Sequence, residues 1–239
     1  MTIDPESSAG PVGPARPGLS LLDGIMTTRA MRRYTDEPVT DEEVWTCLRA
    51  AVQAPSGGNI QPYQFLVVTD PEVKARLGEV YRSAWDRYGT ATNAAVADSF
   101  PTDEARRAWE RNVAASDHLA RHLGEAPVLV LVLMPDIEMT VTDAEGVMDV
   151  GPTYASVYPA VQNFVLAARA LGLGTVLTTV YRIYEDEVRR IVGVPDRYQV
   201  VALLPLGRPQ GRFGVAPRAR SAAAITSWDR YGERRAGPA

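Results

Sequence analysis

The sequence predicts an α+β fold, with a mixed central sheet flanked by helices, and two patterns carry most of that prediction. Residues 128–134 form a continuous apolar run, VLVLVLM, which is typical of a strand buried on both faces. Residues 153–171 instead repeat their apolar side chains at helical spacing, with Val157, Val161 and Phe164 on one stripe. Helix and strand patterns alternate irregularly along the chain, which favours helices packed on a sheet.

The composition indicates one globular domain. The chain has 239 residues, 46% of them hydrophobic and 23% charged, which is enough to bury a core. Its formal net charge of −4 argues against a binder of nucleic acid or anionic membranes, because both need a strongly basic face. The longest apolar run is far shorter than the ~20 residues of a membrane helix. We therefore expect a cytoplasmic protein with no membrane or nucleic-acid partner.

The first twenty residues differ from the rest of the chain. Residues 1–20 carry four prolines and three glycines among small polar residues, which predicts a disordered tail followed by a single domain over residues 21–239. The tail lacks the basic start and apolar core of a secretory signal. Cys47 is the only cysteine, so no disulfide can form within the chain.

Capping and breaking signals place the elements in order. A short helix is predicted over residues 21–28, and Thr40 with Glu43 has the spacing of a capping box that opens the next helix, which Pro55 ends. Further patterns predict strands over residues 63–69, 128–134, 175–180 and 200–206, and helices over residues 71–88, 102–123, 153–171 and 185–192. Pro159 either kinks the third of these helices or marks its true start.

Two basic segments could bind a phosphate. Arg29, Arg32 and Arg33 follow the first helix, and each guanidinium offers a planar fork of donors that suits phosphate oxygens. Arg218 and Arg220 form a second basic segment near the C-terminus. Alone, each segment is better explained as a solvated basic patch, but two such loops could close on one phosphate.

Two polar segments could contact a heterocyclic ligand. Residues 54–63 (APSGGNIQPY) lie between a helix and a buried strand, where two glycines permit a tight backbone and Ser56 and Asn59 supply a hydroxyl and an amide. Residues 177–180 (LTTV) end a strand and offer two hydroxyls. The alternatives are an ordinary turn and a strand with two β-forming threonines.

Two histidines invite a metal interpretation. His118 and His122 stand four residues apart in a predicted helix and would share one face. A metal site would need further ligands, and only Asp117 and Glu125 are near in sequence. We prefer a solvated helix face and predict no metal.

In this order, the segments resemble the nitroreductase-like family of FMN-dependent flavoproteins, from about residue 21 to the C-terminus. The matching stretches are RAMRRY at 29–34 with DEPV at 36–39, APSGGN with QPY at 54–63, QNF through ALGLG at 162–174, and PLGRP at 205–209. The stretch at 54–63 is the most specific, because it is similar to the family's Pro-Ser-x-x-Asn-x-Gln-Pro-aromatic signature.

The resemblance implies a role for each matching position. Arg29 and Arg32 would hold the phosphate and the pyrimidine side of FMN, and Arg218 with Arg220 would complete the phosphate clamp. Ala30 stands where the family usually has a serine, so one phosphate bond is lost. The partner subunit would contribute Pro55, Ser56, Gly57, Asn59 and Gln61. The ring edge near the redox-active N5 atom would be lined by Leu177, Thr178 and Thr179.

The resemblance further implies an interlocked homodimer, with FMN where the subunits meet and the segment around Trp228 wrapped over the partner. The implied enzyme is an NAD(P)H-dependent FMN oxidoreductase. NADH or NADPH would reduce FMN, which would then reduce a nitroaromatic, quinone or similar conjugated acceptor in ping-pong order. Arg32 would stabilise the negative charge of the reduced ring, and no side-chain general base is required.

Three alternatives stay open. The chain could be a flavin-dependent dehydrogenase or ene-reductase of a specific pathway, a non-catalytic protein that sequesters FMN, or a phosphate-ester-binding module without flavin. Residues 81–122, which cover the flavin in the family, contain no Glu…Tyr…Lys set like that of deiodinases, so deiodination is not expected. The aromatic residues of this segment suit either a flat substrate or core packing: Trp85, Tyr88, Phe100 and Trp109.

Overall fold

The structure is a computed structural model of the chain, and it describes residues 18–96, 99–136, 140–149, 151, 153–218 and 220–235. Most of the predicted disordered tail, residues 1–17, lies outside the described residues. Ser20 belongs to the folded part, because its hydroxyl accepts a hydrogen bond from the Asp23 amide and caps the first helix, α1 (Leu21–Thr27).

A four-stranded sheet forms the centre of the molecule. Its order is β1 (Gln64–Val68), β2 (Val128–Pro135), β6 (Tyr198–Gly207) and β5 (Gly174–Thr175). The α+β class is confirmed, but these strand pairs are all antiparallel rather than mixed. The reason lies in the connections.

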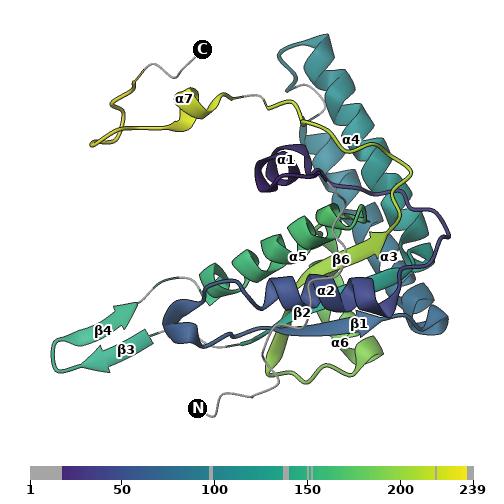
Figure 1. The fold of residues 1–239 in the computed structure, drawn as a ribbon, viewed down its shortest axis with the longest axis horizontal. Helices are drawn as coiled ribbons and strands as arrows, with labels where there is room; N and C mark the ends of the chain where they lie inside the picture. The colour runs from purple at the N-terminus through teal and green to yellow at the C-terminus, as the bar shows by residue number, and fades with distance from the viewer. Residues whose placement is uncertain are drawn as a thin grey trace.

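The connection between β1 and β2 is a helical hairpin. Helix α3 (Pro71–Val96) carries the chain away from the sheet, and α4 (Asp103–His122) brings it back to the end where β1 finished (Figure 1). A strand that re-enters at the same end must run antiparallel to its neighbour. Helix α3 also runs eight residues beyond its predicted end at residue 88, because the alanine-containing stretch 89–96 continues the helix.

The two faces of the sheet bury separate cores, and β2 takes part in both. Val128, Val130 and Val132 point to one core, whereas Leu129 and Leu131 point to the other, as strand alternation requires. All residues from Val128 to Met134 are at most 5% exposed. The continuous apolar run is therefore confirmed as a strand buried on both faces.

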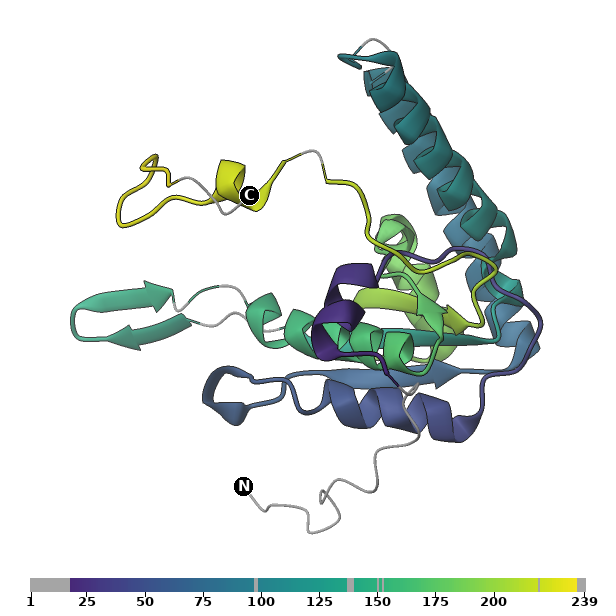
Figure 2. The ribbon, with the colours of Figure 1, turned by 45° about the horizontal axis from the view of Figure 1, so that its top comes forward.

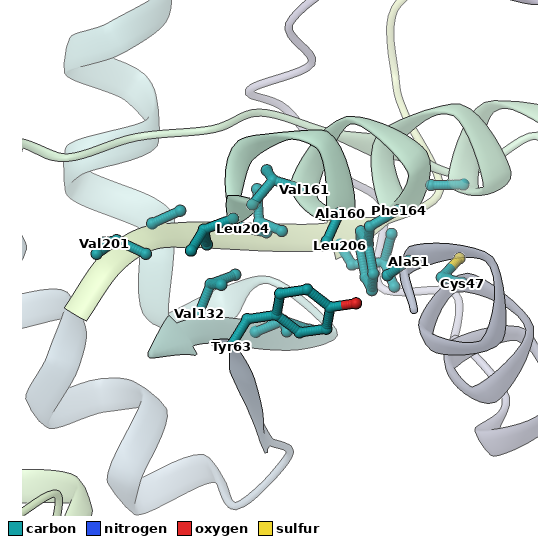
Figure 3. Close-up of a cluster of buried hydrophobic side chains, with 14 of the residues drawn as sticks. Cys47, Ala51, Tyr63, Val132, Ala160, Val161, Phe164, Val201, Leu204 and Leu206 are labelled. Atoms are coloured by element: carbon teal, nitrogen blue, oxygen red, sulfur yellow. The ribbon is translucent and has the colours of Figure 1, made fainter. Parts of the chain in front are cut away.

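The first core lies under α2 (Asp41–Ala51) and α5 (Tyr158–Ala170). Figure 3 shows Cys47 and Ala51 from α2, and Phe164 from α5, facing the strand residues Val132 and Leu204. Phe164 and Cys47 are fully buried. Burial also raises the pKa of the Cys47 thiol to about 12, so this cysteine is an inert core residue.

The second core lies under α3, the end of α4 and α6 (Glu185–Val192). Leu77 and Tyr81 of α3 and Leu119 of α4 pack against Leu131 and Leu203 of the sheet. This arrangement presses the base of the α3–α4 hairpin onto the sheet, while its far end projects well beyond the body (Figure 2).

The capping box that opens α2 is confirmed. The Thr40 hydroxyl accepts from the Glu43 amide at 3.3 Å, and the Glu43 carboxylate accepts from the Thr40 amide at 2.9 Å. Arg208 then donates to the same carboxylate at 2.7 Å. Burial alone would raise the pKa of Glu43, but the hydrogen bonds from Thr40 and Arg208 outweigh it and hold this pKa below its usual value.

Two further predicted elements are wrong in their bounds. The helix over residues 153–171 is a 3-10 turn, η4 (Thr153–Ser156), followed by α5, whose first turn contains Pro159. Proline has no amide hydrogen and suits only the first turn of a helix, so Pro159 marks the true start. The strand over residues 175–180 is reduced to the short β5 and an isolated bridge between Thr178 and Leu203. The chain then turns into η5 (Val180–Tyr184).

Other segments leave the body. The hairpin of β3 (Thr140–Asp143) and β4 (Gly146–Asp149), which the sequence analysis did not predict, projects from one end. Residues 215–218 and 220–235 belong to an extended arm that carries α7 (Ala222–Ile225) (Figures 1 and 2). Among the described residues, no helix combines the length and apolar character needed to cross a membrane.

Candidate functional site

A cavity of about 360 Å³ opens between the α3–α4 hairpin and the segment that follows β5. Its wall brings together Arg32, Leu177 and Thr178, which the sequence analysis assigned to the flavin ring from two distant segments. Further aromatic and polar side chains complete the wall, among them Tyr81, Trp85, Tyr88, Trp109, Asn112 and Ser116. Arg32 is the only charged residue in the described lining.

Arg32 is positioned by its neighbour Met31. The Met31 amide donates to the Thr175 carbonyl at 3.0 Å, and the Met31 carbonyl accepts from the Tyr34 hydroxyl. Met31 is buried, and its side chain packs so close to Gly174 that a Cβ atom there would lie 2.8 Å from the Met31 Cβ. These contacts fix the backbone that presents the Arg32 guanidinium to the cavity.

Thr178 is fixed from both sides of its backbone. Its amide donates to the Leu203 carbonyl at 3.0 Å, and its carbonyl accepts from the Leu203 amide at 3.1 Å. The Thr178 hydroxyl lies 2.7 Å from the hydroxyl of Tyr81, which comes from α3. The sequence analysis missed Tyr81. The available signal was its place on the apolar stripe of α3 with Leu77 and Val80, but that stripe looks the same for an ordinary core residue.

The other residues predicted around the ring and phosphate do not line this cavity. Thr179 is exposed and outside the lining, although it follows Thr178 directly. Arg29 and Ala30 are also exposed. Arg218 and Arg220 lie on the extended arm, where both are exposed. A single chain therefore brings three of the residues predicted around the ring to one cavity, but not those predicted for the phosphate clamp.

The signature segment at residues 55–61 lies elsewhere. It precedes β1 and includes the 3-10 turn η2 (Gly57–Asn59), at the end of the sheet opposite to the base of the α3–α4 hairpin (Figure 1). Its backbone is held by the Ser156 hydroxyl, which accepts from the Gly57 amide at 3.0 Å, and by the Ser56 hydroxyl, which accepts from the Gln61 amide. Pro55, Gly57, Asn59 and Gln61 are exposed. These residues are available to a second subunit but do not contact the cavity of their own chain.

The segment 57–61 has an unusual backbone. Gly58, Asn59 and Gln61 adopt positive φ angles of 57°, 56° and 47°. Asparagine tolerates this left-handed region better than most residues, but two such non-glycine residues so close together are uncommon. The segment is thus a built loop with a defined shape rather than an ordinary turn.

The two histidines lie, as predicted, on a helix face that solvent reaches, where His118 is half-buried and His122 is exposed. Their rings stack with centroids 4.3 Å apart, and the His118 Nδ1 atom accepts from the Arg33 guanidinium at 2.8 Å. His122 contacts the Glu125 carboxylate at 2.9 Å. Among the described residues, no cluster of three or more potential ligands could hold a metal ion.

Three of the four aromatic residues singled out in segment 81–122 line the cavity, namely Trp85, Tyr88 and Trp109. Trp85 and Tyr88 have ring centroids 5.9 Å apart. Phe100 instead lies beside Trp109, with ring centroids 6.1 Å apart, and both residues line a second cavity of about 600 Å³ between α3 and α4. The inner cavity thus offers aromatic side chains together with the Arg32 guanidinium and the Thr178 hydroxyl, which suits a flat heteroaromatic ring.

Residues 25–208 match the sequence pattern of the nitroreductase family. The chain belongs to the nitroreductase family. This match covers more than half of the chain, so the family predicted from the sequence is confirmed, and so is the fold.

Nitroreductase-family relatives agree with this assignment. The chain is 27% identical to the NADPH-flavin oxidoreductase of Vibrio harveyi over 82% of its length and 69% of that protein. It is also 27% identical to an iodotyrosine deiodinase of Thermotoga neapolitana, over 83% and 93% of the two chains. A crystal structure of oxidised iodotyrosine deiodinase, bound to FMN and 3-iodo-L-tyrosine, superposes with a TM-score of 0.65 at 25% identity, covering 87% of this chain and all of that one.

Proposed function

We propose that the protein is an FMN-dependent oxidoreductase that passes electrons from NADH or NADPH to a flat aromatic or conjugated acceptor. The observation that carries this proposal is the meeting of Arg32, Leu177 and Thr178 in one aromatic-walled cavity. Family membership and the flavin oxidoreductase among the relatives support it.

The residues of the cavity fit the ring of FMN. Arg32 supplies a fixed positive charge, which favours the negative charge that a reduced ring carries. Thr178 supplies a hydroxyl at the wall, and the aromatic side chains exclude water from the ring. When bound, FMN supplies the redox chemistry by accepting a hydride and passing the electrons on. Cys47, the only cysteine of the sequence, lies in the opposite core, so its thiol cannot act at this cavity.

A second copy of the chain would complete the site. We propose that Arg29 of one subunit, with Arg218 and Arg220 of an arm, holds the phosphate, and that residues 55–61 of the partner close the ring side. The exposed left-handed loop and the exposed basic residues of the arm support this arrangement, because neither lines the described cavity of its own chain. Such pooling of residues requires the interlocked homodimer that the family resemblance implies.

The acceptor is expected to be neutral or anionic. The described lining contains no aspartate, glutamate or lysine, so nothing there pairs with the ammonium group of a free amino acid. A nitroaromatic, quinone or activated enone needs no such partner. Ping-pong kinetics are expected, because the reductant and the acceptor would use the same face of one ring in turn.

The first experiment is an absorbance spectrum of the purified protein, followed by anaerobic addition of NADPH and of NADH. We expect flavin bands near ~375 and ~450 nm that bleach promptly. Bands that persist would favour the sequestering alternative, and a protein that cannot take up FMN would refute the proposal. Turnover with nitroaromatics, quinones and enones side by side then separates a broad reductase from a dedicated ene-reductase.

Arg32 provides the variant that tests the site. Arg32→Ala should weaken FMN binding roughly tenfold or more, because it removes a charged hydrogen-bond donor from the ring. Arg76→Ala is the matched control, since Arg76 is an exposed arginine of α3 outside the cavity. Equal FMN dissociation constants for the two variants would place the flavin elsewhere.

A further inference from the structure

We infer that Tyr81 is a positioning residue that holds the Thr178 hydroxyl as a hydrogen-bond donor directed into the cavity. The inference rests on the proposed function, because the ligand that would accept this bond is the flavin ring. The acceptor would be an electron-rich atom at the edge of that ring. Neither the sequence motifs nor the family match assigns a role to Tyr81.

The contact between the two hydroxyls is short and sheltered. The Tyr81 oxygen lies 2.7 Å from the Thr178 Oγ1 atom, and Tyr81 is only 2% exposed. Because Tyr81 is so deeply buried, water cannot easily replace this bond. Among the described residues, Thr178 is the only hydrogen-bond partner of the Tyr81 hydroxyl.

The chemistry of the two groups sets the direction of the bond. A phenol is a better donor than an aliphatic hydroxyl, because it is the stronger acid. Burial raises the pKa of Tyr81, while the Thr178 contact and the charge of Arg32 lower it in part, so Tyr81 stays protonated at neutral pH. Tyr81 therefore donates to Thr178.

The backbone of Thr178 is held in place beside the cavity. Its backbone is bonded to Leu203 on both sides, so the side chain stays at the cavity wall. A hydroxyl that accepts one bond still carries a proton to donate, and accepting a bond makes it a stronger donor. The Tyr81–Thr178 pair thus presents a polarised O–H on the same wall as Arg32.

The test is a double-mutant cycle on the flavin-loaded protein, read by the FMN dissociation constant and by the reduction potential of bound FMN. Tyr81→Phe and Thr178→Val should each weaken FMN binding about three- to tenfold and shift the potential. If Tyr81 acts through Thr178, the double variant should be no worse than Thr178→Val alone. Thr178→Ser, which keeps the hydroxyl, should retain the sensitivity to Tyr81→Phe.

Tyr181→Phe is the matched control. Tyr181 is as deeply buried, and its hydroxyl donates to the Val200 carbonyl at 2.9 Å, but it does not line the cavity. It should lower the melting temperature without moving the potential.

The outcomes separate the two proposals. If the wild-type protein takes up no FMN, the proposed function fails and this inference with it. If wild type binds FMN that nicotinamides bleach, yet the Tyr81→Phe and Thr178→Val effects simply add, or Tyr81→Phe matches Tyr181→Phe, only the inference is overturned. Introduction of 3,5-difluorotyrosine at position 81 tests the direction, because a more acidic phenol should tighten FMN binding if it donates and weaken it if it accepts.

Discussion

Gly174 leaves the space in which Met31, the neighbour of Arg32, packs. A Cβ atom at this position would lie 2.8 Å from the Met31 Cβ and 2.9 Å from the Pro209 Cβ. The φ angle of Gly174 is not in the left-handed region, so glycine is required here for space and not for backbone freedom. Since Met31 precedes Arg32, a side chain at Gly174 would displace the segment that carries the cavity's cation.

We predict that Gly174→Ala lowers both stability and flavin affinity. Overpacking of this kind costs about 1–3 kcal/mol, which thermal or urea denaturation would detect. FMN binding should weaken as well, because Met31 and with it Arg32 must move. Gly214→Ala is the control, since a Cβ atom there would meet nothing within 4 Å beyond its chain neighbours, and its φ angle is ordinary. Unchanged FMN affinity in a destabilised Gly174→Ala protein would show that Met31 does not position Arg32.

At the scale of residues, sequence patterns predicted those parts of the site that belong to local motifs. Arg32 and Thr178 were found because each sits in a recognisable segment, and the structure brings them to one cavity. Tyr81 was not predicted, because no local sequence pattern shows that this buried tyrosine contacts Thr178, which lies 97 residues further along the chain. The contact between Arg33 and His118 was missed for the same reason.

That second contact matters at the scale of the element α4, because it holds the wall of the cavity to the arginine segment. Arg33 donates to His118, which requires an unprotonated Nδ1 atom. Burial lowers the pKa of His118 below its ordinary value of 6.5, and the charges of Arg33 and His122 lower it further. Asp117 and Glu125 oppose this shift without cancelling it.

We predict that α4 loosens as the pH falls. Because the folded state lowers the pKa of His118, its stabilising contribution is present above about pH 6.5 and is lost as the pH falls through the folded value. The protection factors of amides around residue 118, which correct for the intrinsic pH dependence of hydrogen exchange, should therefore fall between about pH 7.5 and about pH 5.5. His118→Asn offers an acceptor that does not titrate, so this local pH dependence should vanish. His118→Leu should show low protection factors at both pH values, and identical protection profiles for all three proteins would contradict the prediction.

At the scale of elements, periodicity identified types better than bounds. The buried strand 128–134 and the capping box of α2 were predicted because each has a strong local cause. The strand over residues 175–180 was predicted from β-forming residues, but only Thr178 finds a ladder partner beyond β5. Pairing depends on the neighbouring strand, which no local pattern shows.

The whole molecule leaves an apolar surface uncovered on α1. Leu21, Leu22, Ile25 and Met26 are 74%, 72%, 46% and 60% exposed, which is unusual for one short helix of a monomer. The arm adds Ile225 and Trp228, which are 58% and 45% exposed. Both surfaces favour burial against a second copy, as the proposed homodimer requires.

We predict that Leu22→Glu converts a dimer into a monomer that loses FMN. A buried carboxylate without a partner would oppose association strongly. Light scattering should give the wild type twice the chain mass of 26.0 kDa and the variant a single chain mass. A far-ultraviolet melting curve checks that the variant remains folded. A wild type with one chain mass, or a variant that keeps both its dimer and its FMN, would contradict the shared site.

The antiparallel pairing of β1 with β2 has a consequence for how such a protein can diversify. The chain leaves the sheet at Val68 and returns beside it, because Val68 pairs with Leu129. Residues 69–127 therefore form one long connection between two paired strands, and the two ends of this connection lie side by side at the sheet. The free-energy cost of closing a loop, which is entropic, rises only slowly with loop length, by about 0.6 kcal/mol per doubling. Insertions, deletions or replaced helices in this connection can therefore change the shape of the cavity, while Arg32 and Thr178 keep their positions because they belong to other segments.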